Sequence, residues 1–253
     1  KRECIMNLKL LHIFLLSTAG TFLLCTPFIN TVELANGLVT GKMCWFHLAM
    51  LFFSVCVFFV MLTKKGTVIA FTFSDPLVLF FAGGVLITYK WNLNPEPEKL
   101  IFAGQLVILW FLLRYVLTAY REFKFFFLFV LMFTGLIEAV WGMQQLHGYS
   151  HSNHSLFRLT GSFFNPGPYS GYIAVILPVC LWTALRFQKG MHYFAWICVG
   201  AILIVLPAGM SRSAWIAAVV ACGWVYWTER IGWEKTKAVY RRYKNATIPF
   251  VAI

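Results

Sequence analysis

Residues Arg158 to Tyr172 read R-L-T-G-S-F-F-N-P-G-P-Y-S-G-Y, and this stretch separates two long apolar segments. Asn165-Pro166 is typical of a helix start, because asparagine accepts backbone N–H bonds as the N-cap and proline fits the first helical position. The N-terminus of a helix carries free N–H donors and a partial positive charge, which favour anions. The arginine that opens the stretch strengthens this preference. We therefore expect a polar loop that holds an anionic group where a helix begins.

The composition around this loop is typical of a membrane protein. Hydrophobic residues make up 60% of the 253 residues and charged residues only 12%, and the mean hydropathy is +0.75. Such a chain cannot cover its apolar surface in water, and repeated apolar runs of roughly 16 to 22 residues predict an all-α, polytopic helical membrane protein. We expect a single membrane domain over residues 1–253. Because the sequence lacks an initial Met and stops within an apolar run, we also expect an N-terminal fragment of a longer protein.

Eight transmembrane helices and the start of a ninth are expected along the chain. They cover about residues 8–28, 43–62, 76–90, 99–117, 125–145, 166–185, 193–208 and 213–228, with the ninth starting near residue 248. Ser74-Asp75-Pro76 is typical of two capping residues followed by the first residue of a helix. We therefore assign Asp75 to a helix cap rather than to catalysis.

The basic residues predict the orientation of these helices. With the N-terminus in the cytoplasm, 16 of the 21 lysines and arginines fall in inner segments, as the positive-inside rule requires. The net charge of +12 is therefore a topology signal, and we expect no nucleic-acid partner. The basic link from Glu229 to Lys244 is expected to be a solvated inner loop, and contact with anionic lipid headgroups is the alternative.

Arg158 and Arg212 are the two arginines expected on the outer side, each just before a helix that runs inward. A cation opposes the dipole at a helix N-terminus, so stability alone does not favour this arrangement. A bound anion reverses the penalty, and the planar guanidinium suits a phosphate. Ser211 and Ser213 add hydroxyl donors or helix caps beside Arg212. The alternative is that both arginines only anchor the chain at the membrane interface.

Glu138 lies inside an expected span, about two turns before Gln144-Gln145. A carboxylate in a membrane span is costly and is usually paired or functional. Glu138 can pair with an outer arginine or hold a substrate hydroxyl, and a structural ion pair or a protonated, hydrogen-bonded glutamate is an equal alternative. The candidate substrate-binding residues are Glu138, Gln145, Gly161, Asn165 and Ser211.

Three histidines, His147, His151 and His154, follow in the outer loop. Their spacing, H-x-x-x-H-x-x-H, can ligate a metal ion when the segment is helical. However, Gly148 and the Ser/Asn-rich residues 150–155 disfavour a continuous helix, and no Asp, Glu or Cys stands nearby. We therefore expect a solvated loop with at most one substrate contact, and no metal site.

Three stretches together resemble the O-antigen ligase/polymerase superfamily, in particular the O-antigen ligase-like membrane proteins of Bacteroidetes. They are E-A-V-W-G-M-Q-Q-L-H-G from Glu138, the stretch from Arg158 to Tyr172, and S-R-S-A-W from Ser211. The resemblance covers about residues 75–227, and the G-S-F-F-N-P block is its most specific part.

This resemblance implies a GT-C-like glycosyltransferase of the bacterial inner membrane, with a cytoplasmic N-terminus and a periplasmic active face. Such enzymes of lipopolysaccharide and polysaccharide biosynthesis move a glycan from undecaprenyl diphosphate to lipid A-core, to a growing polysaccharide or to a protein hydroxyl. The implied partners are that lipid-linked glycan, its acceptor and membrane lipids, and no cofactor or metal is needed.

The resemblance also assigns the expected catalytic residues. The family's periplasmic arginines are thought to hold the diphosphate, and the matching positions here are Arg158 and Arg212. The family uses a histidine as the base that activates the acceptor, in a large periplasmic loop after these spans. None of His147, His151 or His154 matches that histidine, so the fragment is expected to lack the catalytic histidine loop.

A flippase or transporter of a lipid-linked or anionic solute is the alternative function. A transporter typically has broken helices and polar groups near the bilayer midplane, often in related halves. Here the polar residues gather at the expected outer face, and the midplane is nearly bare apart from Glu138. This distribution favours an interfacial enzyme. A membrane anchor or assembly subunit is a third possibility, in which replacing both arginines affects folding alone.

Overall fold

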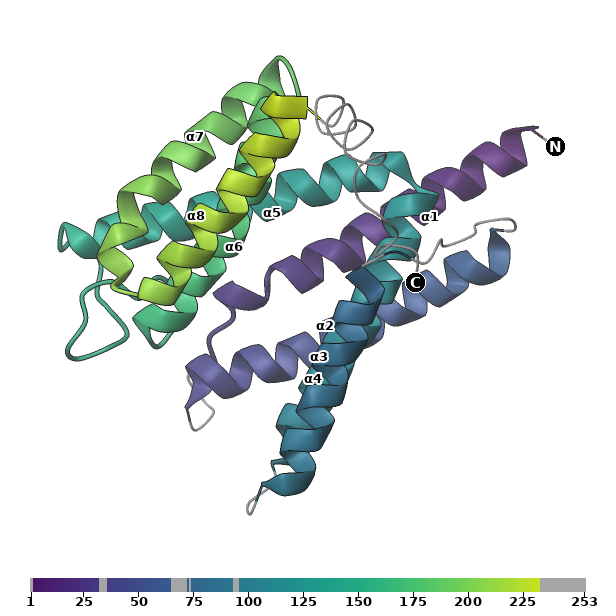
Figure 1. Cartoon of the computed structure of the whole chain (residues 1–253). Helices are drawn as coiled ribbons and strands as arrows, with labels where there is room; N and C mark the ends of the chain where they lie inside the picture. The colour runs from purple at the N-terminus through teal and green to yellow at the C-terminus, as the bar shows by residue number, and fades with distance from the viewer. Residues whose placement is uncertain (1, 32–35, 65–71, 73, 93–95, 233–253) are drawn as a thin grey trace, which may run out of the picture. The chain divides into compact units, whose positions relative to one another are not determined.

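The computed structural model describes residues 2–31, 36–64, 72, 74–92 and 96–232 (Figure 1). Eight α-helices form in these ranges: α1 Arg2–Leu24, α2 Gly37–Thr63, α3 Ser74–Trp91, α4 Pro97–Ala119, α5 Arg121–Leu146, α6 Pro166–Arg186, α7 Gly190–Val205 and α8 Arg212–Tyr226. Short 3-10 helices, η1 (Thr26–Phe28) and η2 (Pro207–Gly209), follow α1 and α7, and the π-helix η3 (Trp227–Gly232) continues α8. The described ranges contain no strand, which confirms the predicted all-α class.

Six of the described helices are long and apolar enough to cross a membrane, namely α1, α2, α4, α5, α6 and α7 with its η2 extension. The prediction of a multi-pass helical membrane protein is therefore confirmed. The predicted third and eighth spans correspond to α3 and α8, which are not among the six: α8 has only 15 residues, and α3 has a charged residue near each end. Eight spans and a GT-C-like arrangement stay predictions, and the expected ninth span lies outside the described residues.

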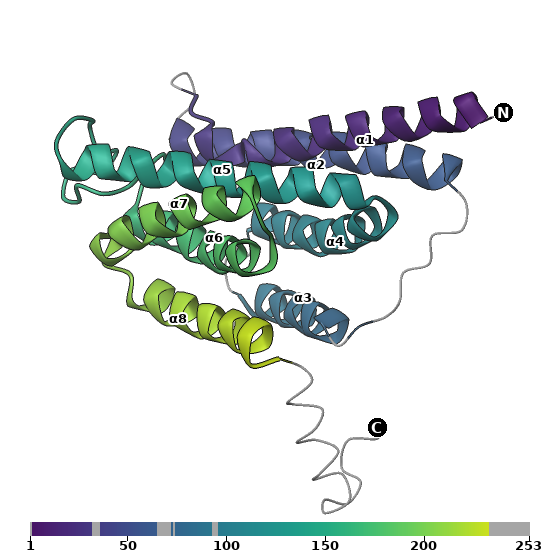
Figure 2. The same ribbon diagram turned by 90° about the horizontal axis from the view of Figure 1, so that it is seen from above.

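The chain divides within α5 into two compact units, Lys1–Val130 and Leu131–Ile253. In the first unit α2 packs against α1 and α4, and α3 packs against α4; α1 and α2 run side by side in Figure 2. Leu16, Phe53, Val57, Val116 and Phe123 form its apolar core. The single membrane domain expected from the sequence stays a prediction.

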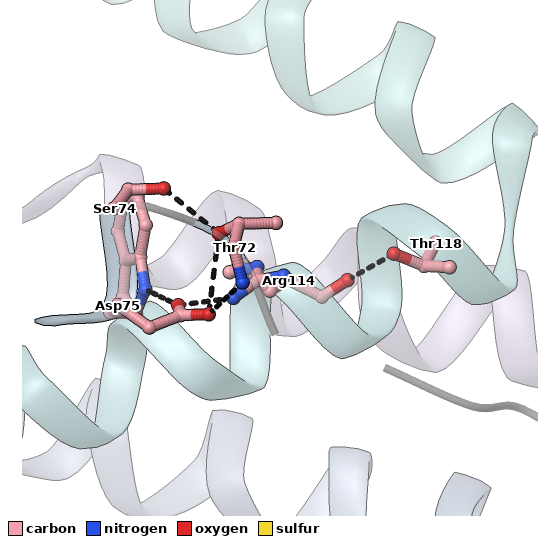
Figure 3. A network of polar contacts seen from close by, with 6 residues as sticks. Thr72, Ser74, Asp75, Arg114 and Thr118 are labelled. Atoms are coloured by element: carbon pink, nitrogen blue, oxygen red, sulfur yellow. Dashed lines mark hydrogen bonds and ion pairs between the residues drawn. The ribbon is translucent and has the colours of Figure 1, made fainter. Parts of the chain in front are cut away.

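Asp75 joins the first turn of α3 to α4, as Figure 3 shows. Its buried carboxylate accepts hydrogen bonds from Thr72 N at 2.7 Å and from Trp110 Nε1 at 3.0 Å, and it pairs with the guanidinium of Arg114. Because α3 begins at Ser74, Asp75 lies in its first turn and not at the predicted cap position, and two of its partners come from another helix. These partners lie 35 and 39 residues from Asp75 in the sequence, so no local sequence pattern predicts the contact.

In the second unit α6 packs against both α7 and α8 (Figure 1). Near the starts of α6 and α8, Ser170 Oγ donates a hydrogen bond to Gly209 O at 3.0 Å. Near their ends, Trp182 Nε1 donates to Glu229 Oε1 at 3.1 Å. Helices α6 and α8 are therefore parallel, and α7, which connects them in the sequence, runs in the opposite direction. Their two N-termini lie together at one end of this unit.

Candidate functional site

The loop between α5 and α6 ends in the helix start that the sequence predicts. Asn165 is the N-cap of α6, with extended backbone angles (φ −132°, ψ 145°), and its side chain accepts a hydrogen bond from Gly167 N at 3.2 Å. Pro166 is the first helical residue. Because the cap satisfies one free N–H donor and proline has none to offer, the helix begins sharply at this point. The predicted start of α6 is confirmed.

Gln145 fixes the loop to the end of α5. Its Oε1 accepts hydrogen bonds from Thr160 N at 2.9 Å and Gly161 N at 2.7 Å, and its Nε2 donates to Gly161 O at 3.1 Å and His151 O at 3.0 Å. The side chain is buried, and these bonds engage both ends of its amide. Gln145 therefore positions the loop. Its expected contact with substrate stays a prediction.

The contact between Glu138 of α5 and Gly161 of the loop is buried, and we call it the floor of the loop. Glu138 Oε2 accepts a hydrogen bond from Ser162 N at 3.0 Å, and Glu138 O accepts one from Tyr169 Oη at 3.2 Å. Gly161 has a φ of +54°, and a Cβ at this position would collide with Glu138 Oε2 and with the Tyr169 ring. Only glycine both adopts this left-handed backbone readily and has no Cβ to collide, so Gly161 lets the loop lie directly on α5. Of the roles weighed for Glu138, a hydrogen-bonded structural one fits these contacts.

A cavity of about 290 Å³ lies beside this floor. The end of α5, the loop, the start of α6 and the segment before α8 line it, through Leu146, Leu156, Phe157, Arg158, Leu159, Pro166, Ala208 and Met210. Arg158 is the one charged residue among them. The cavity therefore combines an apolar wall with a single guanidinium, next to the N-terminus of α6.

Arg212 begins α8 two residues after Met210 of the cavity wall. Both Arg158 and Arg212 are exposed. Within the described ranges the ion pairs to carboxylates are made by Lys9, Lys99, Arg114 and Arg186, and neither Arg158 nor Arg212 takes part in one. Their positive charges are thus not neutralised by an acid of the described chain.

Ser211 occupies the N-cap position of α8, but its side chain makes no capping hydrogen bond there. Its Oγ lies 3.3 Å from Ser213 Oγ instead. Of the two roles expected for Ser211, a hydroxyl donor or a helix cap, the side-chain cap is not formed, and the role as a hydroxyl donor to substrate stays a prediction. Neither α6 nor α8 has an acidic residue in its first turn. The partial positive charges of both helix N-termini are thus not offset by a carboxylate within those turns.

The three histidines of the loop do not converge. His154 Nδ1 accepts a hydrogen bond from Leu156 N at 3.0 Å, and its ring packs against Phe157 and Phe164, with centroids 4.8 and 5.5 Å away. His147 packs instead beside Tyr149. In the part of the chain that the structure describes, no three His, Cys, Asp or Glu residues are grouped as metal ligands. His154 thus supports Phe157, which lines the cavity.

Sequence reasoning missed the other wall of the cavity. Ala208 and Met210 precede α8, and the hydrogen bond between Ser170 and Gly209 brings this segment against the start of α6. Gly209 leaves the room for this contact, because a Cβ there would collide with Ser170 Oγ. The only sequence signal was the small residue itself, which marks a close approach without naming the partner.

No family model matches the sequence, and neither a curated protein nor a solved structure matches the chain. Its function is therefore inferred from the residues of the site.

Proposed function

We propose that this chain is a periplasmic-face glycosyltransferase of the bacterial inner membrane, which moves a glycan from undecaprenyl diphosphate to lipid A-core, a polysaccharide or a protein. One observation carries the proposal: Arg158 lines an otherwise apolar cavity at the N-terminus of α6. Met210 lines the same cavity, and Arg212, the first residue of α8, follows two residues later in the sequence. The proposal keeps the eight-span, GT-C-like architecture with a cytoplasmic N-terminus.

The chemistry of the donor matches the composition of this cavity. A polyprenyl diphosphate joins a concentrated negative charge to a long apolar chain. Guanidinium groups and helix N-termini both favour phosphate oxygens, and guanidinium can bind them in a bidentate manner. The apolar side chains around Arg158 suit the first part of the isoprenoid. Arg212 supplies the second cation that a diphosphate can use.

In the proposed reaction the acceptor hydroxyl oxygen attacks C1 of the sugar, and the bond from C1 to the diphosphate oxygen breaks. The bonding electron pair leaves with the diphosphate, and the hydroxyl proton passes to a base or to solvent. Arg158, Arg212 and the two helix N-termini stabilise the negative charge that develops on the leaving group. Attack from the face opposite the diphosphate inverts the anomeric centre.

The test replaces each arginine by lysine, which keeps the charge but loses the planar fork. Arg158→Lys and Arg212→Lys are introduced singly into the full-length gene and expressed in cells that lack it, with Arg186→Lys as the control. Arg186 lies at the other end of α6 and is also exposed. Lipid-linked glycan on each membrane face and glycan on the acceptor are then measured, with protein levels checked in the membrane.

The glycosyltransferase proposal predicts that periplasmic lipid-linked glycan accumulates and transfer falls by roughly tenfold or more in the two site variants, as expected when about 1.4 kcal/mol of leaving-group stabilisation is lost. Accumulation on the cytoplasmic face alone would indicate the flippase alternative. If both variants behave like the Arg186 control, the two arginines are interface anchors and the proposal is wrong.

A further inference from the structure

A second and larger cavity, of about 570 Å³, lies between α3 and α4 in the first unit. At one end its wall is apolar, with Phe80, Phe81 and Val85. At the other end, where α3 finishes and α4 begins, the wall is polar, with Asn92, Glu96 and Lys99. A neighbouring apolar cavity of about 290 Å³ shares Val85 and Leu100 with the first. Two neighbouring grooves, of which the larger is polar at one end, therefore lie along α3 and α4.

Glycines keep these grooves open. Gly84 lines the larger groove and Gly104 the smaller one, and a Cβ built at either position would have no heavy atom of the described chain within 4 Å. Glycine inside a helix costs about 1 kcal/mol relative to alanine, and in membrane helices close helix packing commonly compensates for that cost. Among the described residues of the first unit, none approaches these two positions closely. The missing side chains leave room for a ligand instead.

The polar end of the larger groove carries one charge of each sign. Lys99 Nζ lies 3.0 Å from Glu96 Oε1 and 2.9 Å from Glu96 Oε2, and both side chains are exposed. A headgroup that contains a phosphate and an ammonium can exchange partners with this pair, phosphate to Lys99 and ammonium to Glu96. A purely anionic headgroup would meet repulsion from Glu96, so the pair favours a zwitterionic ligand.

We propose that the α3–α4 grooves bind one membrane phospholipid whose headgroup carries a phosphate and a primary ammonium, as in phosphatidylethanolamine. Its two acyl chains occupy the grooves on either side of Val85 and Leu100, and its headgroup lies at Asn92, Glu96 and Lys99. Tyr89 also lines this groove, and tyrosine is a residue type that commonly meets lipid headgroups. The residues that line this site do not line the Arg158 cavity, and the proposal does not depend on the proposed transferase activity.

The test uses the purified full chain in nanodiscs of phosphatidylglycerol that contain a trace of phosphatidylethanolamine with a photoreactive acyl chain. A phosphatidylglycerol probe with the same acyl chain serves as the comparison, and mass spectrometry maps the labelled residues. The ethanolamine probe is expected to label Phe80, Phe81 and Val85 about two- to fivefold more than the glycerol probe, as one exposed charge pair allows. Equal labelling, or stronger labelling by the glycerol probe, overturns the proposal.

Two variants locate the binding. Gly84→Leu fills the larger groove and is expected to cut labelling by the ethanolamine probe severalfold. Gly83→Leu is the matched control, because Gly83 also has open space around it, lies on the same helix and lines neither groove. Glu96→Gln is expected to keep chain labelling but remove the preference for the ethanolamine probe. If Gly84→Leu and Gly83→Leu label alike while both keep native helicity, the grooves hold no specific lipid.

Discussion

Gly161→Ala tests the floor on which the proposed diphosphate site is built. Gly161 has a left-handed backbone (φ +54°), and an alanine Cβ would collide with Glu138 Oε2 and the Tyr169 ring. The left-handed conformation costs an L-residue about 1–2 kcal/mol, and overpacking a buried contact adds about 1–3 kcal/mol. We therefore expect the free energy of unfolding to fall by about 2–5 kcal/mol.

Gly148→Ala separates the two parts of this cost. Gly148 lies in the same loop and is also left-handed (φ +80°), but no heavy atom of the described chain lies within 4 Å of the position that its Cβ would take. Its replacement should cost about 1–2 kcal/mol, from the backbone alone. Both variants are purified in detergent micelles, and their unfolding is followed by circular dichroism during titration with sodium dodecyl sulfate.

The difference between the two variants is the measure of the contacts made by Gly161. A loss at Gly161 that exceeds the loss at Gly148 by about 1–3 kcal/mol supports the packing of the loop on Glu138 and Tyr169. Equal losses would refute it, because the steric part would then be absent.

Three further predictions concern single contacts. Gln145→Glu replaces the Nε2 group, which donates to two backbone carbonyls, by an acceptor oxygen, so the free energy of unfolding should fall by about 1–3 kcal/mol in the same titration. Gln144→Ala, at an exposed position, should change the free energy of unfolding little. Asn165→Ala should cost about 1 kcal/mol through the lost N-cap bond, whereas Ser211→Ala should be nearly neutral because that serine makes no such bond. Arg114→Met removes the ion-pair partner from a buried carboxylate, so hydrogen exchange at the start of α3 should rise while exchange in α6 stays unchanged.

The sequence predicted those parts of the structure whose causes are local. Apolar runs of membrane-spanning length located the helices, because each helix satisfies its own backbone hydrogen bonds in lipid. Asn165-Pro166 located the start of α6 to the residue, because a cap and a first-turn proline act on neighbouring backbone groups. The all-α class followed from the same two signals.

The contacts that the sequence did not predict join residues far apart in the chain. Gln145 holds backbone groups 15 and 16 residues further on, and Arg114 reaches Asp75 across 39 residues. Neither pairing leaves a repeat or a fixed spacing in one sequence. A side-chain cap, one of the two roles expected for Ser211, does not form for a related reason, since the residue type permits a cap bond but the loop geometry decides whether it forms.

The central claim is that Arg158, a loop residue in the cavity beside the start of α6, binds the diphosphate of the donor. The most direct measurement is the affinity of the purified chain for undecaprenyl diphosphate, compared among the unmodified chain, Arg158→Gln and the control Arg186→Gln, which lies at the end of α6 away from the cavity. We predict that Arg158→Gln weakens binding by about tenfold or more, as loss of a charge-assisted bidentate contact implies, and that Arg186→Gln leaves it unchanged. Equal affinity of all three proteins would contradict the claim.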